Sequence, residues 1–85
     1  MKEELHQLSC YVENKPGVLA RIVGLFAGRG YNIQTLSVGP TEDGTVSRMR
    51  IGVLGTDRVI RQIVLQLSNQ VNVIEVTVRH AVRRG

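Results

Sequence analysis

The chain has 85 residues, enough for one small domain that buries only about 60–65% of the surface its unfolded chain would expose, so we expect oligomerisation to add stability. Its single cysteine, Cys10, excludes an intrachain disulfide and fits a core position, and no Cys/His spacing typical of a zinc site is present. The formal net charge of +4 permits an acidic partner, but two tyrosines and one phenylalanine are few for the stacking platform of a nucleic-acid module.

The sequence carries no targeting or membrane signal. No apolar run approaches the roughly 18–20 residues that span a bilayer. The charged start at residues 1–4 is followed by strand-like alternation, which differs from a signal peptide. We therefore expect a cytoplasmic, soluble protein with no membrane partner.

Basic residues gather at the C-terminal end of the chain, at Arg79, Arg83 and Arg84. A solvated tail, or a contact with an acidic protein surface, explains such a cluster. We assign residues 1–80 to one domain and residues 81–85 to a basic tail.

The first predicted element is a strand over about residues 4–13, because apolar Leu8, Cys10 and Val12 alternate with polar residues. It leads into the turn Asn14-Lys15-Pro16-Gly17, which directly precedes a helix. Unpaired N–H groups and a partial positive charge collect at such a point, so the turn is a candidate anion site.

Two side chains decide how this turn is interpreted. Gly17 leaves the backbone open to an approaching ligand because it has no Cβ. Asn14 offers both hydrogen-bond donors and an acceptor, and an ordinary helix start with Asn14 as the N-cap or turn residue is the alternative.

A helix is predicted over about residues 17–29, since one apolar face is formed by Val18, Leu19, Ile22, Leu25 and Phe26. Gly24 and Gly28 weaken helix propensity, which indicates close packing on their side. Gly30 is expected in the left-handed conformation that ends a helix.

A hairpin follows the helix. Residues 31–40 read as an edge strand, because Pro40 cannot donate to a central ladder. The turn at Asp43-Gly44 offers a residue tolerant of positive φ. The second strand runs over residues 45–54, with Met49, Ile51 and Val53 on the core face.

The chain closes with a helix from Thr56 or Asp57 to about Asn69, and with a strand over about residues 71–80. In this last strand, one face is formed by Ile74, Val76 and Val78. The order βαββαβ predicts an α+β, ferredoxin-like fold: one four-stranded antiparallel sheet with two helices on one face.

No catalytic constellation is found, so we expect a protein that is not an enzyme. His6 and His80 are far apart in sequence and read as bystanders on strands, and no serine lies in a nucleophile-type turn. Gly28-Arg29-Gly30 closes a helix, whereas a dinucleotide fingerprint opens one. The remaining candidate is the Asn14–Gly17 turn with Asn32, where a small zwitterion fits. Its carboxylate could accept hydrogen bonds from the N–H groups at the helix start, and its ammonium group could donate to the asparagine side-chain oxygens.

The segment Glu13-Asn14-Lys15-Pro16-Gly17-Val18-Leu19 within this element order resembles the ACT domain, a small regulatory module that binds amino acids. Three further parts resemble the small regulatory subunit of acetolactate synthase (acetohydroxyacid synthase) more narrowly: Arg21-Ile22-Val23-Gly24-Leu25-Phe26, then Arg29-Gly30-Tyr31-Asn32-Ile33 with Leu36-Ser37-Val38-Gly39-Pro40-Thr41, and Ser47-Arg48-Met49. The resemblance covers the chain from about Leu5 to Val78.

The resemblance implies a partner, an effector and a dimer. The partner would be the catalytic subunit, which would hold thiamine diphosphate, Mg and FAD, while this chain has no cofactor of its own. The chain would raise the partner's activity and confer feedback inhibition by valine, with leucine and isoleucine as alternatives. A homodimer would form through the strand at residues 31–40 and produce a continuous sheet.

The family's effector site, carried over residue by residue, lies between two chains. One chain would contribute Asn14, Gly17, Val18 and Leu19, and the other would contribute Asn32 and Ile33. Many members of the family have a second C-terminal domain, so a chain that stops at Gly85 is either a naturally short member or a part of a longer protein.

Two alternatives share the βαββαβ order. RNA-recognition domains stack bases on aromatic residues of the first and third strands, where this chain offers only Tyr11, with Arg48 and Arg50 as basic support. A small acylphosphatase-type enzyme needs an arginine loop after the first strand, and no such loop is present.

Overall fold

The computed structural model describes residues 3–79, so His80 and the basic tail at residues 81–85 lie outside the described residues. Six elements follow in the predicted order, within two residues of the predicted bounds: β1 (Glu4–Glu13), α1 (Val18–Gly28), β2 (Asn32–Pro40), β3 (Val46–Gly55), α2 (Asp57–Ser68) and β4 (Val73–Arg79). Neither helix of the described part is long and apolar enough to cross a membrane.

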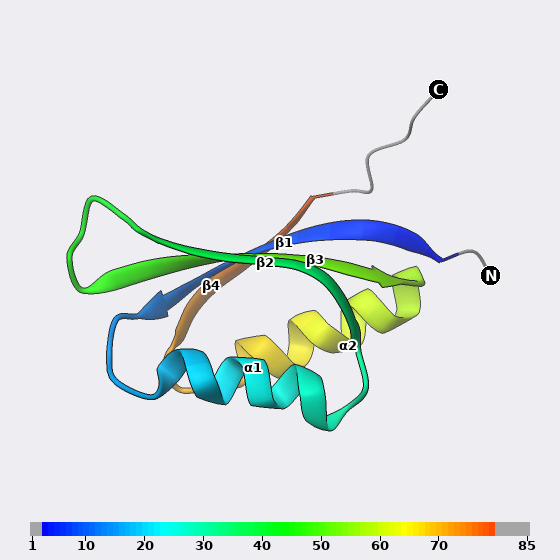
Figure 1. The fold of residues 1–85 in the computed structure, drawn as a ribbon, viewed down its shortest axis with the longest axis horizontal. Helices are drawn as coiled ribbons and strands as arrows, with labels where there is room; N and C mark the ends of the chain where they lie inside the picture. The colour runs from blue at the N-terminus through cyan, green and yellow to red at the C-terminus, as the bar shows by residue number, and fades with distance from the viewer. Residues whose placement is uncertain (1–2, 80–85) are drawn as a thin grey trace.

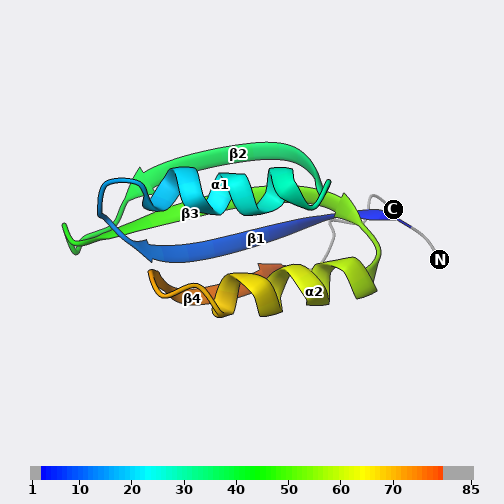
Figure 2. The same ribbon diagram turned by 90° about the horizontal axis from the view of Figure 1, so that it is seen from below.

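The strands form one antiparallel sheet in the order β2-β3-β1-β4. Both helices lie on the same face of this sheet (Figure 1), with α1 beneath β2 and β3 and α2 beneath β4 (Figure 2). The predicted α+β, ferredoxin-like architecture is confirmed, and β2 is an edge strand as its proline indicated. The opposite face of the sheet has no covering layer among the described residues.

The core lies between the sheet and the two helices. Its buried apolar residues come from the predicted faces: Leu8, Cys10, Val12, Val18, Ile22, Phe26, Met49, Ile51, Val53, Ile60, Ile63 and Leu67. Leu19, expected on the buried face of α1, is 40% exposed because it lies at the margin of that face, towards β2. At the start of α2, the Thr56 hydroxyl accepts a hydrogen bond from the Val59 N–H at 3.3 Å, which makes Thr56 the N-cap.

The predicted face of the last strand is wrong at its first residue. The register between β1 and β4 shifts between Tyr11 and Val12, so that Val73 pairs with Val12. Val73 therefore packs against the core, whereas Ile74 is 56% exposed. A bulge of this kind changes which residues face inward, and period-two alternation cannot reveal it.

Glycines account for two further corrections. Gly44 does not adopt positive φ, because the turn is held by the Asp43 carboxylate, which accepts hydrogen bonds from the Thr45 N–H and hydroxyl at 2.9 and 2.7 Å. Gly24 and Gly28 are exposed, and a Cβ at either position would meet no described atom within 4 Å, so close packing does not explain them. Gly30 does have positive φ, 68°, as predicted for the end of α1.

Candidate functional site

The turn between β1 and α1 is held in place by two hydrogen bonds from Asn14 to backbone carbonyls of the β2–β3 turn. The Asn14 N–H donates to the Thr45 carbonyl at 2.8 Å, and the Asn14 side chain donates to the Gly44 carbonyl at 3.3 Å. Gly17 is the residue at the N-cap position, with φ of 83°, a left-handed conformation that favours glycine. The turn thus has a defined conformation that positions the first N–H groups of α1.

The start of α1 has no side-chain cap among the described residues. Asn14, the expected N-cap candidate, uses its amide on Gly44 instead. No acidic residue lies in the first turn of the helix either, so its partial positive charge is not neutralised from within the helix. The Val18 N–H donates to the Lys15 carbonyl at 3.3 Å, which leaves the Leu19 and Ala20 N–H groups available to an acceptor from outside, and a carboxylate is the natural one.

A recess of about 440 Å³ opens beside this helix start and falls in the size range of small-molecule sites. It is lined by Val12, Glu13, Asn14, Lys15, Pro16, Gly17, Leu19 and Ser47. Glu13 and Ser47 were not among the residues predicted from the sequence. Their place follows from the sheet register, because Ser47 pairs with Val12 on one side and with Pro40 on the other.

The charges in the recess are arranged around Glu13. Its carboxylate accepts a hydrogen bond from the Asn72 side chain at 2.7 Å and forms an ion pair with Lys15 at 3.4 Å. These contacts, the Asn72 hydrogen bond first, lower the pKa of Glu13 below its ordinary value. Glu13 is therefore ionised at neutral pH, and Lys15 balances its charge.

The remaining predicted residues lie elsewhere in the same chain. Asn32 and Ile33 start β2, beyond the other end of α1, and the 11-residue helix separates them from Gly17 by about 16 Å. The Asn32 side chain is exposed and accepts a hydrogen bond from Gln34 at 2.8 Å. Val18 is 4% exposed and does not line the recess, whereas Leu19 is accessible and does. One chain therefore does not bring both halves of the predicted site together.

The fold is that of an ACT domain. The solution structure of the ACT domain from the GTP pyrophosphokinase of Chlorobium tepidum superposes with a TM-score of 0.81, covering 100% of this chain and 96% of that one. The two sequences are only 15% identical, so this likeness shows the fold alone.

The chain belongs to the family described as the AHAS small subunit-like ACT domain, whose family model matches residues 8–75. It is 50% identical over 72 residues to a probable acetolactate synthase small subunit of Archaeoglobus fulgidus, covering 85% of this chain and 45% of that one. The crystal structure of the acetolactate synthase small subunit from Thermotoga maritima matches with a TM-score of 0.81 at 44% identity, covering 86% of this chain and 45% of that one. The chain thus spans less than half the length of these relatives.

Proposed function

We propose that this chain is a non-catalytic, cytoplasmic regulatory module of acetolactate synthase, which binds a branched-chain amino acid, valine in the first place, between two copies of the chain. The family membership supports the assignment to acetolactate synthase. One observation supports the position of the effector site: α1 begins without a side-chain cap beside an open recess. Occupancy of the site changes the activity of the catalytic subunit, which holds thiamine diphosphate, Mg and FAD.

Each part of an amino acid has a matching group in this proposal. The ligand carboxylate accepts from the free N–H groups at the start of α1, where Gly17 leaves the approach open. The ammonium group binds the side-chain oxygen of Asn32 from the second copy and carbonyl groups of β2. The aliphatic side chain lies against Leu19, which is 40% exposed at the margin of the recess.

The exposed edge of the sheet supports the second copy. Within residues 3–79, β2 has a free edge, and its residues Leu36 and Val38 are 44% and 46% exposed on the face that the helices cover. Leu19 and Val23 of α1 are 40% and 39% exposed. Arg21 of the same helix donates a hydrogen bond to the Asn72 side chain on the α2 side. Leu19 and Val23 share the other side of the helix, which faces β2. An unpaired edge beside apolar side chains favours pairing with another strand.

The direction of β2 explains why the second copy completes the recess. The strand runs from Asn32 to Pro40, and Pro40 pairs with Ser47, which lines the recess. Antiparallel pairing of two β2 strands about a two-fold axis near Leu36 sets Asn32 of one chain beside Pro40 of the other. In that arrangement Asn32 of the second copy approaches the recess that the first copy leaves open.

Calorimetry tests the effector. We expect a binding heat when L-valine, L-leucine or L-isoleucine is added to the folded protein, and no heat with D-valine, because its groups cannot all reach the same partners. Absence of heat for all three L-amino acids, with the protein folded and dimeric, would overturn the effector assignment.

Co-purification tests the partner. The chain is expressed with the catalytic subunit, and acetolactate formation is measured with and without valine. We expect the complex to form, to exceed the activity of the catalytic subunit alone and to lose that gain when valine is added. A catalytic subunit that neither binds the chain nor changes its rate contradicts the regulatory role.

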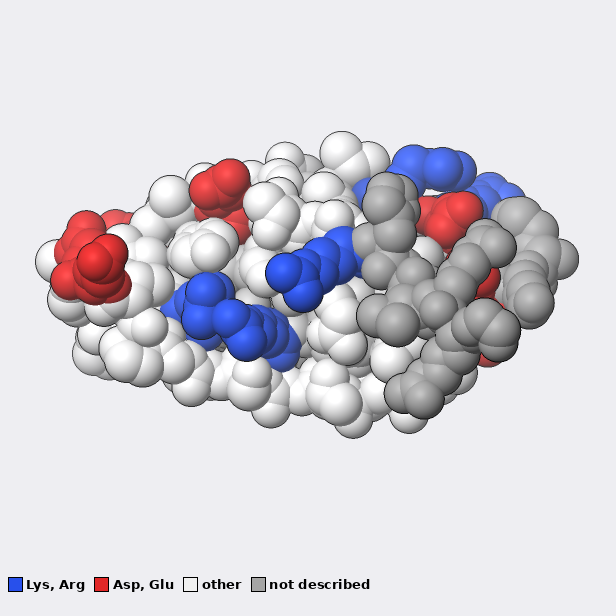
Figure 3. All heavy atoms as spheres, turned by 90° about the horizontal axis from the view of Figure 1, so that it is seen from above, with Lys and Arg blue, Asp and Glu red and all other residues white. Residues whose placement is uncertain are grey.

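An RNA-binding module is the second candidate, because the open sheet face is basic. Arg48, Arg50 and Arg79 line a shallow groove of about 380 Å³ on this face together with Tyr11. Basic side chains gather near the middle of the face (Figure 3). Tyr11 is its only aromatic residue among the described residues, since Tyr31 packs edge-to-face on Phe26 at 5.8 Å on the helix side. One ring gives little stacking. A gel shift with mixed single-stranded RNA decides: a shift that persists at physiological salt would favour this candidate.

A further inference from the structure

His6 is the one polar or charged residue in the buried set of the described chain, with 4% of its surface exposed. It lies on β1 with its side chain on the helix side of the sheet, at the end remote from the recess described above. Its Nε2 atom has no hydrogen-bond partner among the described residues. A buried polar atom without a partner carries a desolvation cost of about 1–3 kcal/mol, which indicates that a partner is normally present.

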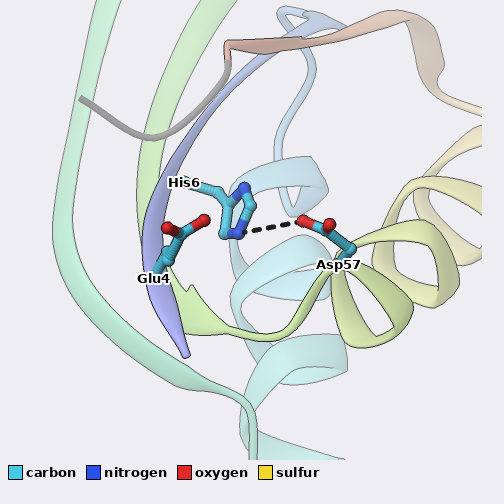
Figure 4. A group of neighbouring side chains, drawn as sticks. All are labelled: Glu4, His6 and Asp57. Atoms are coloured by element: carbon cyan, nitrogen blue, oxygen red, sulfur yellow. Dashed lines mark ion pairs between the residues drawn. The ribbon is translucent and has the colours of Figure 1, made fainter. Parts of the chain in front are cut away.

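Two carboxylates converge on this nitrogen (Figure 4). Glu4 lies two residues before His6 on the same strand and therefore on the same face. Asp57 follows the C-terminal end of β3. Glu4 pairs with Gly55, the last residue of β3, and α2 begins two residues later at Asp57. The ligand atoms of the three side chains all lie within 4.8 Å of one another.

The distances do not fit direct hydrogen bonding. His6 Nε2 and Asp57 Oδ1 are 3.7 Å apart, which is longer than a hydrogen bond. Two ligands of one tetrahedral zinc ion, with bonds of about 2.0–2.2 Å, lie roughly 3.4 Å from each other. The observed spacing therefore leaves room for an ion between the groups, and small rotations of the carboxylates, of which Glu4 is half-buried and Asp57 exposed, close the remaining difference. Asp57 has that freedom, since its side chain is 79% exposed.

We propose that Glu4, His6 and Asp57 bind a divalent transition-metal ion of the zinc type, which ties the start of β1 to the first turn of α2. Neutral imidazole and carboxylate oxygens are ligands that zinc accepts, and the two carboxylates match its charge of two. Three protein ligands leave a fourth position for water. The ion supplies the partner that Nε2 lacks and holds the two elements together.

Binding at this cluster is independent of the effector site. The recess lies at the opposite end of β1, and the strand from His6 to Val12 separates the two by about 20 Å. Loss of metal binding and loss of valine binding are therefore separate outcomes. The cluster could not be predicted from the sequence, because Glu4 and His6 meet Asp57 only after β1 and β3 have paired.

The test is titration of the metal-free protein with ZnCl₂ by calorimetry, and with CoCl₂ by visible absorption, which reports displacement of water from the ion. We expect one ion per chain and a midpoint of thermal unfolding that rises with zinc concentration. His6→Gln removes the nitrogen ligand. Asp57→Asn weakens one carboxylate ligand at an exposed position, so this variant keeps the fold. Each variant is expected to weaken zinc binding at least about tenfold. Removing a residue that only hydrogen-bonds a metal ligand already lowers metal affinity by about 10–100-fold, and loss of a ligand itself should cost no less.

The control carries the same kind of change outside the cluster. Glu75→Gln removes an exposed carboxylate of β4. It is expected to keep the wild-type affinity. The proposal is overturned if the wild-type protein binds no zinc at micromolar concentration, or if His6→Gln and Asp57→Asn bind as tightly as the wild type.

Discussion

The side-chain amide of Asn14 donates to the carbonyl oxygen of Gly44, 30 residues further along the chain, at 3.3 Å. This bond ties the start of α1 to the β2–β3 turn and withdraws the side chain best suited to cap the helix. Because the Asn14 side chain bonds Gly44, it does not cap α1. The N–H groups that remain free at the start of this helix are the basis of the proposed carboxylate site.

A negative charge at Gly17 should abolish effector binding. Gly17→Asp places a carboxylate where the ligand's carboxylate binds, and two such charges about 4 Å apart near a surface repel by about 1–4 kcal/mol. We expect valine affinity to fall at least about tenfold in calorimetry.

Gly17→Asn is the matched control, because asparagine has the same shape without the charge and tolerates the left-handed φ of 83° about equally. It should bind valine more tightly than Gly17→Asp. Equal affinities for the two variants would show that shape or strain, and not charge, controls the site.

A charged residue at the β2 edge should prevent dimerisation. Val38 is 46% exposed on this edge, so Val38→Lys costs the single chain little but places an ammonium group in the proposed interface. We expect a dimer of the wild type and a monomer of the variant in sedimentation at micromolar concentration, with valine binding lost in the variant.

The same substitution at Val71 serves as its control, because Val71 is 88% exposed in the α2–β4 connection and away from β2. Val71→Lys should remain a dimer. A monomeric wild type, or a dimeric Val38→Lys, would rule out the edge as the interface.

Alanine at Gly24 should stabilise the protein. The residue lies inside α1, and an added Cβ would meet nothing within 4 Å. Alanine removes the entropic cost of a helical glycine, so the free energy of unfolding should rise by about 0.5–1 kcal/mol in urea.

Gly52 gives the opposite outcome and serves as the control. A Cβ there would collide with the Thr35 hydroxyl across β2 and β3. Gly52→Ala should therefore lower the free energy of unfolding by about 1–3 kcal/mol. Destabilisation by Gly24→Ala would instead reveal a contact of α1 with another chain.

Stability should fall in alkaline solution partly through Cys10. Burial raises the pKa of its thiol from 9.0 to about 11, so the folded protein keeps the proton while the unfolded chain releases it. The unfolded state then binds fewer protons, and the free energy of unfolding decreases as pH rises from about 9 to about 11.

Chemical denaturation across this pH range measures the effect, with Cys10→Ala as the reference for all other titrating groups. The wild type should lose more stability than the variant. Parallel curves would show that the thiol proton does not contribute.

Local periodicity was enough to predict most of the fold. The alternation of Leu8, Cys10 and Val12 and the helical spacing of Ile22 and Phe26 place their residues in the core as expected. The register between the strands could not be predicted, because it depends on the partner strand. The bulge opposite Tyr11 turns Val73 inward and exposes Ile74.

The candidate sites divide in the same way. The turn at Gly17 was visible in the sequence because its residue types are contiguous, and its positive φ agrees with a glycine requirement. The position of Asn32 beyond the far end of α1 follows from the length of that helix. The sequence pattern indicates only a histidine on a strand at position 6. The burial of His6 and the missing hydrogen bond at its Nε2 atom depend on the surrounding fold, so they could not be predicted.

The separation of Gly17 and Asn32 by the length of α1 has a genetic consequence. The proposed two-fold dimer has two effector sites, and each combines Gly17 of one chain with Asn32 of the other. A chain defective at Gly17 and a chain defective at Asn32, each insensitive to effector alone, form a mixed dimer in which one site has both defects and the other has none. We therefore expect coexpression of two such alleles to restore the proposed feedback, whereas two alleles altered at the same residue should not complement each other.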